Sequence, residues 1–593
     1  MNSSWRHLVL FVFVVGLFAA VAAKLFYLQI ISHQKYVALA EAQHWVTSEI
    51  FAKRGEILTR DGFPLAANQQ AFLLYAEPKK ITDKRKTIEA ILPSIVEELM
   101  ASPSAKADSH YIAQATEDLV NRLESGLSWV SLAHKLPMEK KAILEKLSLP
   151  GLGFEEESRR FYPEQTLAAH LLGFVASDDR GQDKGYFGLE GFYDGHLRGR
   201  SGWVKEEKNS WGEPLLLGEF QKIPPLEGQD LVLTVNHATQ FLVEEKLRQA
   251  VVETGAEAGT VIIQNPKTGE ILALANFPNF NPGDWRETSG GSETREVSEG
   301  ATLTERKIER RDLAIAATYE PGSVIKALTM AAGIEEGKIK PDTTFEDNGP
   351  LYVGGYKIDT WNFQHHGYET MTQVLINSCN IGAAWVSRLL GVGKLVPYFE
   401  KFNFSSRLGL DLEGEDTGVI KPVGEWGETE LATAAFGQGI SATPLQVLEI
   451  FSTLANDGVL FKPYVVEKIV NQDREIKTKP RAIRRVVSAK TAKTVVEMLT
   501  QVVEKSKSPN YTLRDRYVVA GKTGTAQIPE GGTYDPNKTN TTFVGFLPAH
   551  PEFVMLVKLE QPKTSPYAEV VAVPLWMEIA KELVLQMGIP PDR

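Results

Sequence analysis

The sequence contains a single cysteine, Cys379, among 593 residues. One cysteine excludes an internal disulfide framework and a zinc site built from several cysteines. The eleven histidines show no HExxH-type spacing, and the pair His365-His366 is more typical of a loop than of a metal site. The sequence therefore predicts no metal site and no cofactor.

Basic residues are outnumbered by acidic ones, which gives a net charge of −11. This balance argues against a general nucleic-acid binder, so no nucleic acid is expected as a partner. No fixed-period repeat is present. With 43% hydrophobic and 23% charged residues, the composition is that of a globular protein. The length predicts two or more domains of about 100–200 residues each.

Long apolar runs are also scarce, and only one approaches bilayer length. Leu8 to Ala23 carries no charge, and beyond Lys24 the apolar character continues over Leu25–Ile31. Because Lys24 can snorkel, we expect an uncleaved single-pass anchor over residues 8–31. Arg6 then leaves residues 1–7 in the cytoplasm and the rest of the chain outside. The alternative is a signal peptide cleaved at the A-x-A-like Ala20-Val21-Ala22.

The region after the anchor predicts a first domain over residues 32–225. Asp61-Gly62 marks a hairpin turn between residues 56–58 and 65–67. Residues 87–100 and 111–123 have helical patterns. The segment Pro224–Gly228 indicates a boundary, which leaves residues 226–593 as a second domain.

The second domain alternates strands and helices in a way that predicts an α+β fold. Its residues 327–455 are mostly helical, and residues 281–311 are expected to form a flexible surface insertion. A final helix over residues 575–587 has the apolar face Leu575, Ile579, Leu583 and Met587. We expect an antiparallel five-stranded sheet flanked by helices. Its strands are expected at residues 259–264, 270–274, 516–520, 541–546 and 553–558.

A serine and a lysine one helical turn apart stand at the start of the helical part. Pro321-Gly322 ends the preceding segment, and the run after Ser323 reads as a buried helix that carries Lys326. A serine hydroxyl is a poor nucleophile unless a base takes its proton. Lys326 can be that base only when neutral, so its pKa must fall from the ordinary value of about 10.4. Burial and the positive charge of Lys522 would both lower it.

Two later motifs complete a known set of three. Ser323-Val324-Ile325-Lys326, Ser378-Cys379-Asn380 and Lys522-Thr523-Gly524-Thr525 match the S-x-x-K, S-D-N and K-T-G motifs in order. Taken singly, each motif also fits a purely structural interpretation. The first could carry a solvated helix lysine, the second a turn between helices and the third a hairpin turn. Together they indicate acyl transfer through a serine. Cys379 is interpreted as a packing residue.

The residue types suggest a role for each position. Ser378 could relay a proton between Lys326 and the leaving amine, and Asn380 suits positioning of a substrate amide. Gly524 would let the substrate backbone lie against the strand edge. A substrate carboxylate would be held by Lys522, Thr523 and Thr525. The backbone N–H groups of Ser323 and Thr525 are expected to form the oxyanion hole.

These motifs resemble the class B penicillin-binding proteins, which are monofunctional peptidoglycan D,D-transpeptidases. The resemblance extends over nearly the whole chain, through the anchor and four further segments. These are Arg54-Gly55-Glu56-Ile57, Arg160-Phe161-Tyr162-Pro163, Gly188-Leu189-Glu190-Gly191 and Phe436-Gly437-Gln438-Gly439. It implies an elongated non-catalytic pedestal beneath a transpeptidase domain. It also implies attack on the D-Ala-D-Ala end of a stem peptide, with β-lactams as covalent inhibitors.

The resemblance further implies partners in the bacterial cytoplasmic membrane. Glycan polymerisation would need a SEDS-type glycosyltransferase and other divisome membrane proteins. Asn380 and Thr523 are more similar to the division-type branch than to the elongation-type branch, which remains an alternative. The doublet Arg310-Arg311 departs from the Asn-Arg that relatives often have. A serine β-lactamase and a non-catalytic β-lactam sensor or scaffold are the competing hypotheses.

Overall fold

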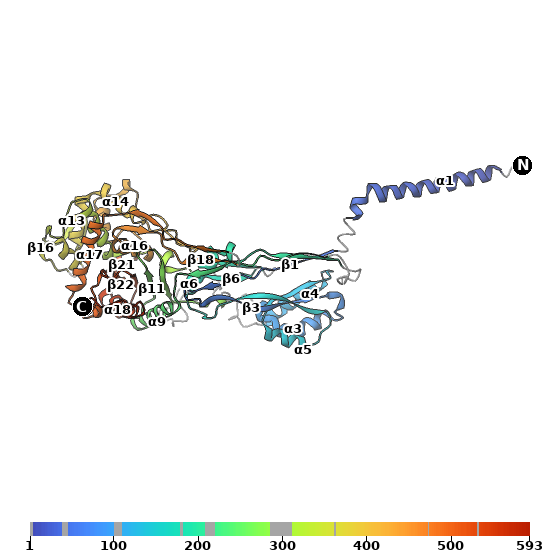
Figure 1. The fold of residues 1–593 in the computed structure, drawn as a ribbon, viewed down its shortest axis with the longest axis horizontal. Coiled ribbons are helices and arrows are strands. Elements are labelled where there is room, and N and C mark those ends of the chain that lie inside the picture. Colours follow the sequence, from blue (N-terminus) through green and yellow to red (C-terminus); the bar gives the residue numbers. More distant parts are fainter. Residues whose placement is uncertain are drawn as a thin grey trace.

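The computed structural model describes residues 4–37, 45–99, 109–177, 182–207, 220–284, 311–360, 363–471, 474–530 and 533–593. The described chain is elongated, with a bulky C-terminal end and a thinner middle part (Figure 1). Most of the expected surface insertion at residues 281–311, including Arg310, lies outside the described residues.

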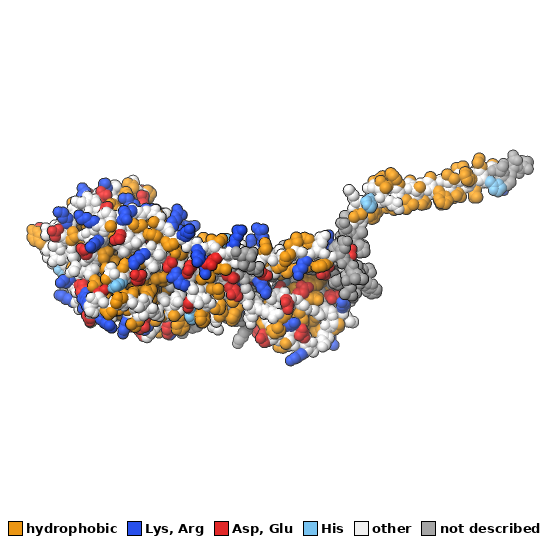
Figure 2. Space-filling model, viewed as in Figure 1, with side chains coloured by type: hydrophobic (Ala, Val, Ile, Leu, Met, Phe, Trp, Pro, Cys, Tyr) orange, Lys and Arg blue, Asp and Glu red, His pale blue; other side chains and the backbone are white. Residues whose placement is uncertain are grey.

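Helix α1 (Ser4–Phe26) stands apart from the rest of the molecule and continues into a π-helical turn, Tyr27–Ile31 (Figure 1). The 27 residues from Trp5 to Ile31 contain an 18-residue window with a mean hydropathy of 2.6, and none of this window is buried. Apolar side chains cover most of the visible surface of this helix (Figure 2). At about 1.5 Å per residue, such a helix exceeds the ~30 Å hydrocarbon core of a bilayer. Within the described part of the chain, it is the one helix that fits a single-pass membrane anchor.

The hairpin expected around Asp61-Gly62 is present. Strand β2 (Ile57–Leu58) pairs antiparallel with β3 (Pro64–Ala76), and Gly62 has the positive φ of 83° that the turn requires. Strand β3 continues into pairing with β4 (Val130–Leu136) and β5 (Leu152–Phe161).

Helices cover this N-terminal sheet. The helical patterns are confirmed by α3 (Lys84–Leu99) and α4 (Ser109–Glu124), and α5 (Met138–Lys146) joins them. Ile88, Ile91 and Ile95 of α3 are fully buried because they recur on one helix face and pack in the same core as Leu74 of β3. A separate antiparallel sheet consists of β1 (Trp45–Ile50), β8 (Gly202–Glu207) and β9 (Phe220–Ile223). Between β5 and β8 lie α6 (Ala169–Leu172), β6 (Phe174–Ser177), β7 (Asp183–Tyr186), α7 (Gly188–Phe192) and α8 (Asp194–Leu197).

Strands from both sides of the expected boundary near residue 225 share one sheet. Strand β10 (Asp230–Leu233) pairs parallel with β2 and antiparallel with β18 (Val466–Val470), which pairs with β19 (Glu475–Lys477). The N-terminal sheet is therefore continuous, through hydrogen bonds, with strands far along the chain.

A buried ionic cluster lies beside this shared sheet. Arg54 Nε and Arg160 Nε donate to the two carboxylate oxygens of Glu190, at 2.7 and 2.6 Å. Glu190 is fully buried, and the two guanidinium groups hold its pKa below the ordinary value against the opposing effect of burial. Three of the segments that carry the family resemblance thus meet at one point.

The C-terminal part confirms the α+β prediction. Its five-stranded sheet has the order β12-β11-β23-β22-β21, with every pair antiparallel. The strands are β11 (Ala258–Gln264), β12 (Ile271–Phe277), β21 (Ala520–Glu530), β22 (Thr533–Phe546) and β23 (Val554–Glu560).

Alternate residues of this sheet face two different cores. Val261 and Ile263 pack with α9 (His237–Thr254) and α18 (Ala568–Gln586). Ile262 packs with the core that contains α11 (Lys326–Glu335) and α16 (Pro444–Ala455). Figure 1 shows α9 and α18 on one side of the sheet and α16 on the other. On α18, Leu575, Ile579 and Leu583 are buried as expected, but Met587 follows the helix and is 37% exposed.

The expectation of a strand at residues 516–520 is wrong. Residues 516–519 do not belong to a strand, because Tyr517 and Val518 are held by the C-terminal segment through Ile589 O and Asp592 Oδ2. The strand that carries the third motif instead begins at Ala520.

The helical part between β12 and β21 also contains three two-stranded sheets, one of which pairs β17 (Val459–Phe461) with β20 (Ala482–Arg485). Strand β13 (Thr344–Asp347) pairs with β16 (Gly367–Thr370), and β14 (Leu351–Val353) pairs with β15 (Tyr356–Ile358). The capping box at Thr443 and Gln446 starts α16, with Pro444 as its first residue. The helices are α10 (Leu313–Ala316), α11 (Lys326–Glu335), α12 (Met371–Ile376), α13 (Asn380–Leu390), α14 (Val392–Lys401), α15 (Glu428–Ala434), α16 (Pro444–Ala455) and α17 (Ala489–Glu504).

Candidate active site

Ser323 lies in a 3-10 turn, Gly322–Ile325, that leads directly into α11. Gly322 has φ +63°, and its N–H donates to Gly437 O at 3.0 Å. This contact brings the Phe436–Gly439 segment against the turn. Val324 is completely buried, whereas Ser323 is only half-buried. The local fold therefore fixes the backbone of the turn and leaves the serine side chain accessible.

Lys326 is the first residue of α11, and it is fully buried. Its Nζ lies 3.0 Å from Ser323 Oγ, 2.6 Å from Ser378 O and 2.7 Å from Asn380 Oδ1. A neutral amine has two N–H bonds and one lone pair. The two carbonyl-type oxygens can take the two N–H groups, which leaves the lone pair for the hydroxyl of Ser323.

The environment favours this neutral form. Burial lowers the pKa of Lys326 well below its ordinary value, and the nearby charge of Lys522 lowers it further. Both causes named from the sequence are therefore present. The Cys379 and Glu369 side chains act in the opposite direction.

Ser378 occupies a strained position between two helices. Helix α12 ends in a Schellman-type pattern: the N–H of Ser378 donates to Leu375 O, and the N–H of Cys379 donates to Val374 O. Glycine usually fills the left-handed residue of this motif, but here Ser378 does, with φ +55°. The strain costs about 1–2 kcal/mol. The turn brings both the carbonyl and the hydroxyl of Ser378 to Lys326.

Asn380 opens α13 and is oriented by a residue that the sequence did not single out. Its Nδ2 donates to Asp359 O at 2.9 Å, so its Oδ1 faces Lys326. Cys379 between these two motif residues caps α13, because its Sγ accepts from Gly382 N–H at 3.3 Å. Burial raises the pKa of this thiol to about 12, so Cys379 is no nucleophile at neutral pH.

Strand β21 brings the third motif to the same place. Lys522 is buried, and its Nζ lies 3.0 Å from Ser378 Oγ. Burial lowers the pKa of Lys522 to about 8. Since β21 is the last strand in the sheet order, one of its edges has no strand neighbour within the described chain. Such an edge suits pairing with an extended peptide.

Packing within the protein constrains Gly524 more closely than the substrate binding that the sequence suggested. A Cβ at this position would lie 2.8 Å from Pro321 O and 3.1 Å from Val324 Cγ1. Gly524 therefore lets β21 approach the turn that carries Ser323.

The remaining predicted positions lie on the same strand. Thr523 is half-buried, and its carbonyl oxygen lies 3.3 Å from Lys522 Nζ. Thr525 is exposed, and its Oγ1 accepts from Ala568 N–H at the start of α18. The structure thus brings Ser323, Lys326, Ser378, Asn380 and Lys522 into one contact network, with Thr523 and Thr525 along the adjoining strand.

Sequence reasoning missed a contact between two segments beside the turn that carries Ser323. Tyr534 of β22 places its hydroxyl 3.2 Å from both carboxylate oxygens of Glu320, which also accepts from Gly439 N–H. Glu320 lies three residues before Ser323, but nothing in the spacing of Tyr534 indicates this contact.

Comparison with known proteins identifies the two parts of the chain. Residues 259–583 match the penicillin binding protein transpeptidase domain, and residues 49–233 match the penicillin-binding protein dimerisation domain. Stage V sporulation protein D of Bacillus subtilis is 32% identical over 100% of this chain and 88% of its own length. Peptidoglycan D,D-transpeptidase FtsI of Escherichia coli is 26% identical over 99% of this chain and 93% of its own length.

Solved structures agree with these matches. Penicillin binding protein 3 of Mycobacterium tuberculosis, complexed with ampicillin, aligns with a TM-score of 0.65 at 25% identity. The alignment covers 92% of this chain and 97% of that chain. A transpeptidase domain that follows a dimerisation domain defines a class B penicillin-binding protein. The chain belongs to the penicillin-binding protein transpeptidase family.

Proposed function

We propose that this chain is a peptidoglycan D,D-transpeptidase that cross-links stem peptides through an acyl-enzyme on Ser323. The observation that carries the proposal is the position of Lys326 Nζ, 3.0 Å from Ser323 Oγ and fully buried. The relative FtsI, which is named as a peptidoglycan D,D-transpeptidase, supports the assignment over 99% of the chain.

In the acylation step, Ser323 Oγ attacks the carbonyl carbon of the penultimate D-Ala. Its proton passes to the lone pair of Lys326. The developing oxyanion would accept from the backbone N–H groups of Ser323 and Thr525, each worth about 3–4 kcal/mol. Ser323 N–H lies in the first turn of a 3-10 helix, where N–H groups have no partner within the helix.

Collapse of the intermediate breaks the bond between the carbonyl carbon and the D-Ala nitrogen. The leaving amine takes up a proton that returns from Lys326 through Ser378 Oγ, which contacts both Lys326 and Lys522. D-Ala departs, and the donor peptide remains as an ester on Ser323.

Transfer reverses the proton movements. The acceptor amine attacks the ester carbonyl and gives up a proton to Lys326, while the carbon–oxygen bond to Ser323 breaks and Ser323 Oγ is reprotonated. Lys522, Thr523 and Thr525 hold the terminal carboxylate of the donor before acylation. A β-lactam follows only the first half: its amide bond opens on Ser323, but the leaving nitrogen stays attached and blocks the acceptor. The ampicillin complex of the Mycobacterium tuberculosis protein supports β-lactams as ligands.

The cellular role we propose is septal wall synthesis during cell division. The match to FtsI favours the division-type branch over the elongation-type alternative. We propose a tail at residues 1–7, an anchor at 8–31 in the bacterial cytoplasmic membrane, a pedestal at 32–225 and a transpeptidase domain at 226–593 outside the cytoplasm. A SEDS-type glycosyltransferase and other divisome membrane proteins are the proposed partners.

The test is intact-mass spectrometry of the detergent-solubilised chain after treatment with benzylpenicillin. We expect the wild-type chain to gain the mass of one penicillin and to keep it for hours, and Ser323→Ala to gain none. Ser378→Ala is the matched control, because it should label slowly and still at Ser323. Labelled Ser323→Ala would refute the nucleophile, and rapid loss of the adduct would indicate a β-lactamase.

A further inference from the structure

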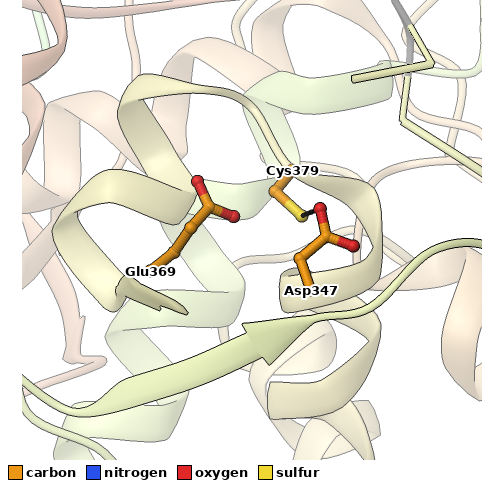
Figure 3. A group of neighbouring side chains, drawn as sticks. All are labelled: Asp347, Glu369 and Cys379. Carbon is orange, nitrogen blue, oxygen red and sulfur yellow. Dashed lines mark hydrogen bonds between the residues drawn. The ribbon is translucent and has the colours of Figure 1, made fainter. Parts of the chain in front are cut away.

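Three buried side chains converge directly behind the turn that holds Ser378 and Asn380. Asp347, Glu369 and Cys379 are 2%, 1% and 0% exposed. Each offers one ligand atom, and these atoms all lie within 4.8 Å of one another. Figure 3 shows the three side chains pointing toward one small space from separate parts of the chain.

The backbone accounts for this convergence. Strands β13 and β16 pair antiparallel with Phe345 opposite Glu369, so Asp347, two residues further, lies on the same face as Glu369. Phe345, Asp347 and Glu369 are all buried, which places this face toward the interior. Cys379 reaches the same space as the cap of α13.

The Glu369 carboxylate is only half satisfied. One of its oxygens accepts from Asn377 Nδ2, but Oε2 is buried without a hydrogen-bond partner. Burying an unpaired carboxylate oxygen costs free energy, and a cation removes that cost. Asp347, in contrast, accepts from the N–H of Gly349 at 3.3 Å and lies 3.9 Å from Cys379 Sγ.

We propose that Asp347, Glu369 and Cys379 bind one zinc ion. Thiolate with carboxylate is a donor set that zinc accepts and that magnesium and calcium do not favour. Zinc lies about 2.3 Å from sulfur and about 2.0–2.2 Å from oxygen, so a contraction of about 1 Å completes the site. Binding displaces the proton of the Cys379 thiol to solvent.

His365 contacts one of the three ligands and is the candidate for a fourth. Its Nδ1 lies 3.1 Å from Asp347 Oδ1, and its Nε2 lies 3.4 Å from Asp359 Oδ1. A carboxylate on the outer ring nitrogen is a common way to orient a zinc-bound histidine. The backbone of Asp359 in turn holds Asn380.

This proposal departs from the expectation that the chain has no metal site. The expectation rested on one cysteine and on the absence of a histidine motif. The ligands come from β13, β16 and the start of α13, so no spacing along the sequence indicates a metal site.

The site would stabilise the second catalytic motif. Cys379 lies between Ser378 and Asn380, which both contact Lys326 Nζ. Zinc would fasten this strained turn to the small β13–β16 sheet. The effect on acylation rests on the proposed function, whereas zinc binding does not.

Metal analysis of the full chain, purified in detergent without a chelator or a histidine tag, tests the binding. We expect about one zinc per chain by mass spectrometry of the metal. After removal of zinc, Co²⁺ should produce a thiolate-to-cobalt charge-transfer band, and Zn²⁺ should abolish it. A chain that holds no zinc and gives no cobalt band would overturn the proposal.

Variants assign the ligands. Cys379→Ser and Glu369→Gln should each lower zinc affinity about 100-fold or more. Glu449→Gln is the matched control, since Glu449 is also fully buried with one oxygen bound by Gln264 and the other unpaired. It belongs to no candidate metal cluster among the described residues, so its zinc content should not change.

Two further results distinguish zinc binding from catalysis. If Cys379→Ser does not fold, the cobalt spectrum of the wild-type chain decides alone. Removal of zinc should slow acylation of Ser323 by benzylpenicillin and lower the melting temperature, and added Zn²⁺ should restore both. If zinc binds but Ser323 does not label, the zinc site stands and the proposed function fails. Equal zinc content in the wild-type chain and in both ligand variants would overturn the proposed site.

Discussion

Lys326 and Lys522 both lie against the same hydroxyl, although one begins a helix and the other belongs to an edge strand. Ser378 Oγ is 3.1 Å from Nζ of Lys326 and 3.0 Å from Nζ of Lys522. Two buried amines that share one hydroxyl cannot both carry a charge without cost. Burial lowers the pKa of both lysines, and the charge of Lys522 lowers that of Lys326 further, so we expect Lys326 to be the neutral base and Lys522 the cation.

This division predicts how acylation depends on alkaline pH. The pKa of Lys522 is about 8, so its charge is lost above that value and the carboxylate of benzylpenicillin is held less well. We expect the second-order acylation rate to fall up to about tenfold per pH unit above pH 8. Lys522→Arg keeps its charge, so its acylation rate should not fall above pH 8. Its rate near neutral pH should be lower than the wild-type rate, because the guanidinium group fits the carboxylate differently.

Lys558→Arg is the control for that profile. Lys558 is another buried lysine, on strand β23 of the same sheet, but it pairs with Glu560. In stopped-flow measurements with a fluorescent penicillin, the acylation rate of Lys558→Arg should fall above pH 8 as the wild-type rate does. A wild-type rate that stays flat to pH 10 would contradict the role of the Lys522 charge.

Lys326 predicts a pH dependence of stability. Because burial lowers its pKa, the unfolded chain binds a proton at neutral pH that the folded chain does not. The wild-type free energy of unfolding should therefore gain a rising contribution with pH, up to the unfolded pKa of about 10.4. Lys326→Met removes this contribution.

The measurement is the melting temperature of both chains between pH 6 and pH 9. Relative to the wild-type chain, Lys326→Met should become more stable as the pH falls, while its acylation rate drops about 10²–10⁴-fold at every pH. A stability difference that does not change with pH would show that Lys326 is charged in the folded chain.

Gly524 predicts a steric link between the third motif and the turn that carries Ser323. In Gly524→Ala, the new Cβ would meet Pro321 O at 2.8 Å and Val324 Cγ1 at 3.1 Å. We expect a loss of about 1–3 kcal/mol in stability. Acylation should slow as well, because the turn that carries Ser323 must move.

Gly393→Ala provides the control. Gly393 lies in α14, and a Cβ there would meet nothing within 4 Å. This change should stabilise the chain by about 0.5–1 kcal/mol and leave acylation unchanged. Wild-type acylation in Gly524→Ala would mean that the strand and the turn adjust independently.

Much of the site could be predicted because its residues belong to short sequence motifs with fixed spacing. The spacing of Ser323 and Lys326 fixes them on one helical turn. The third motif lies on a strand as expected, although the strand expected there was placed at residues 516–520. The Ser378-Cys379-Asn380 segment is also the turn between two helices that its composition suggests. The interpretation of that segment as a catalytic motif is therefore compatible with its interpretation as a turn between helices.

The rest depends on contacts that sequence spacing does not encode. The polar stretch from His33 to Glu49 is compatible with a helix, but residues 45–50 form β1, because β8 pairs with them from far along the chain. Asp359 orients Asn380 through a backbone carbonyl, which leaves no mark in the residue type. Strand β21 begins at Ala520 because the C-terminal segment holds the residues before it.

The buried ionic cluster of the pedestal predicts a large difference between two adjacent arginines. Arg160 donates to Glu190 in a fully buried pair, whereas Arg159 lies 3.7 Å from Glu98 and is 42% exposed. Arg160→Ala leaves Glu190 with Arg54 alone, so we expect a loss of about 3–5 kcal/mol. Arg159→Ala should change stability by less than about 0.5 kcal/mol.

The pH dependence of this loss has a definite sign. Arg160 and Arg54 lower the pKa of Glu190, so their stabilising effect is present above the ordinary carboxylate pKa and is lost as the pH falls through the lowered value. In Arg160→Ala the pKa of Glu190 rises, and protonation relieves the uncompensated charge. Calorimetric melting should therefore show the largest difference from the wild-type chain near pH 7 and a smaller one toward pH 4. Equal differences at both pH values would mean that the loss comes from packing of the arginine stem, since packing does not titrate.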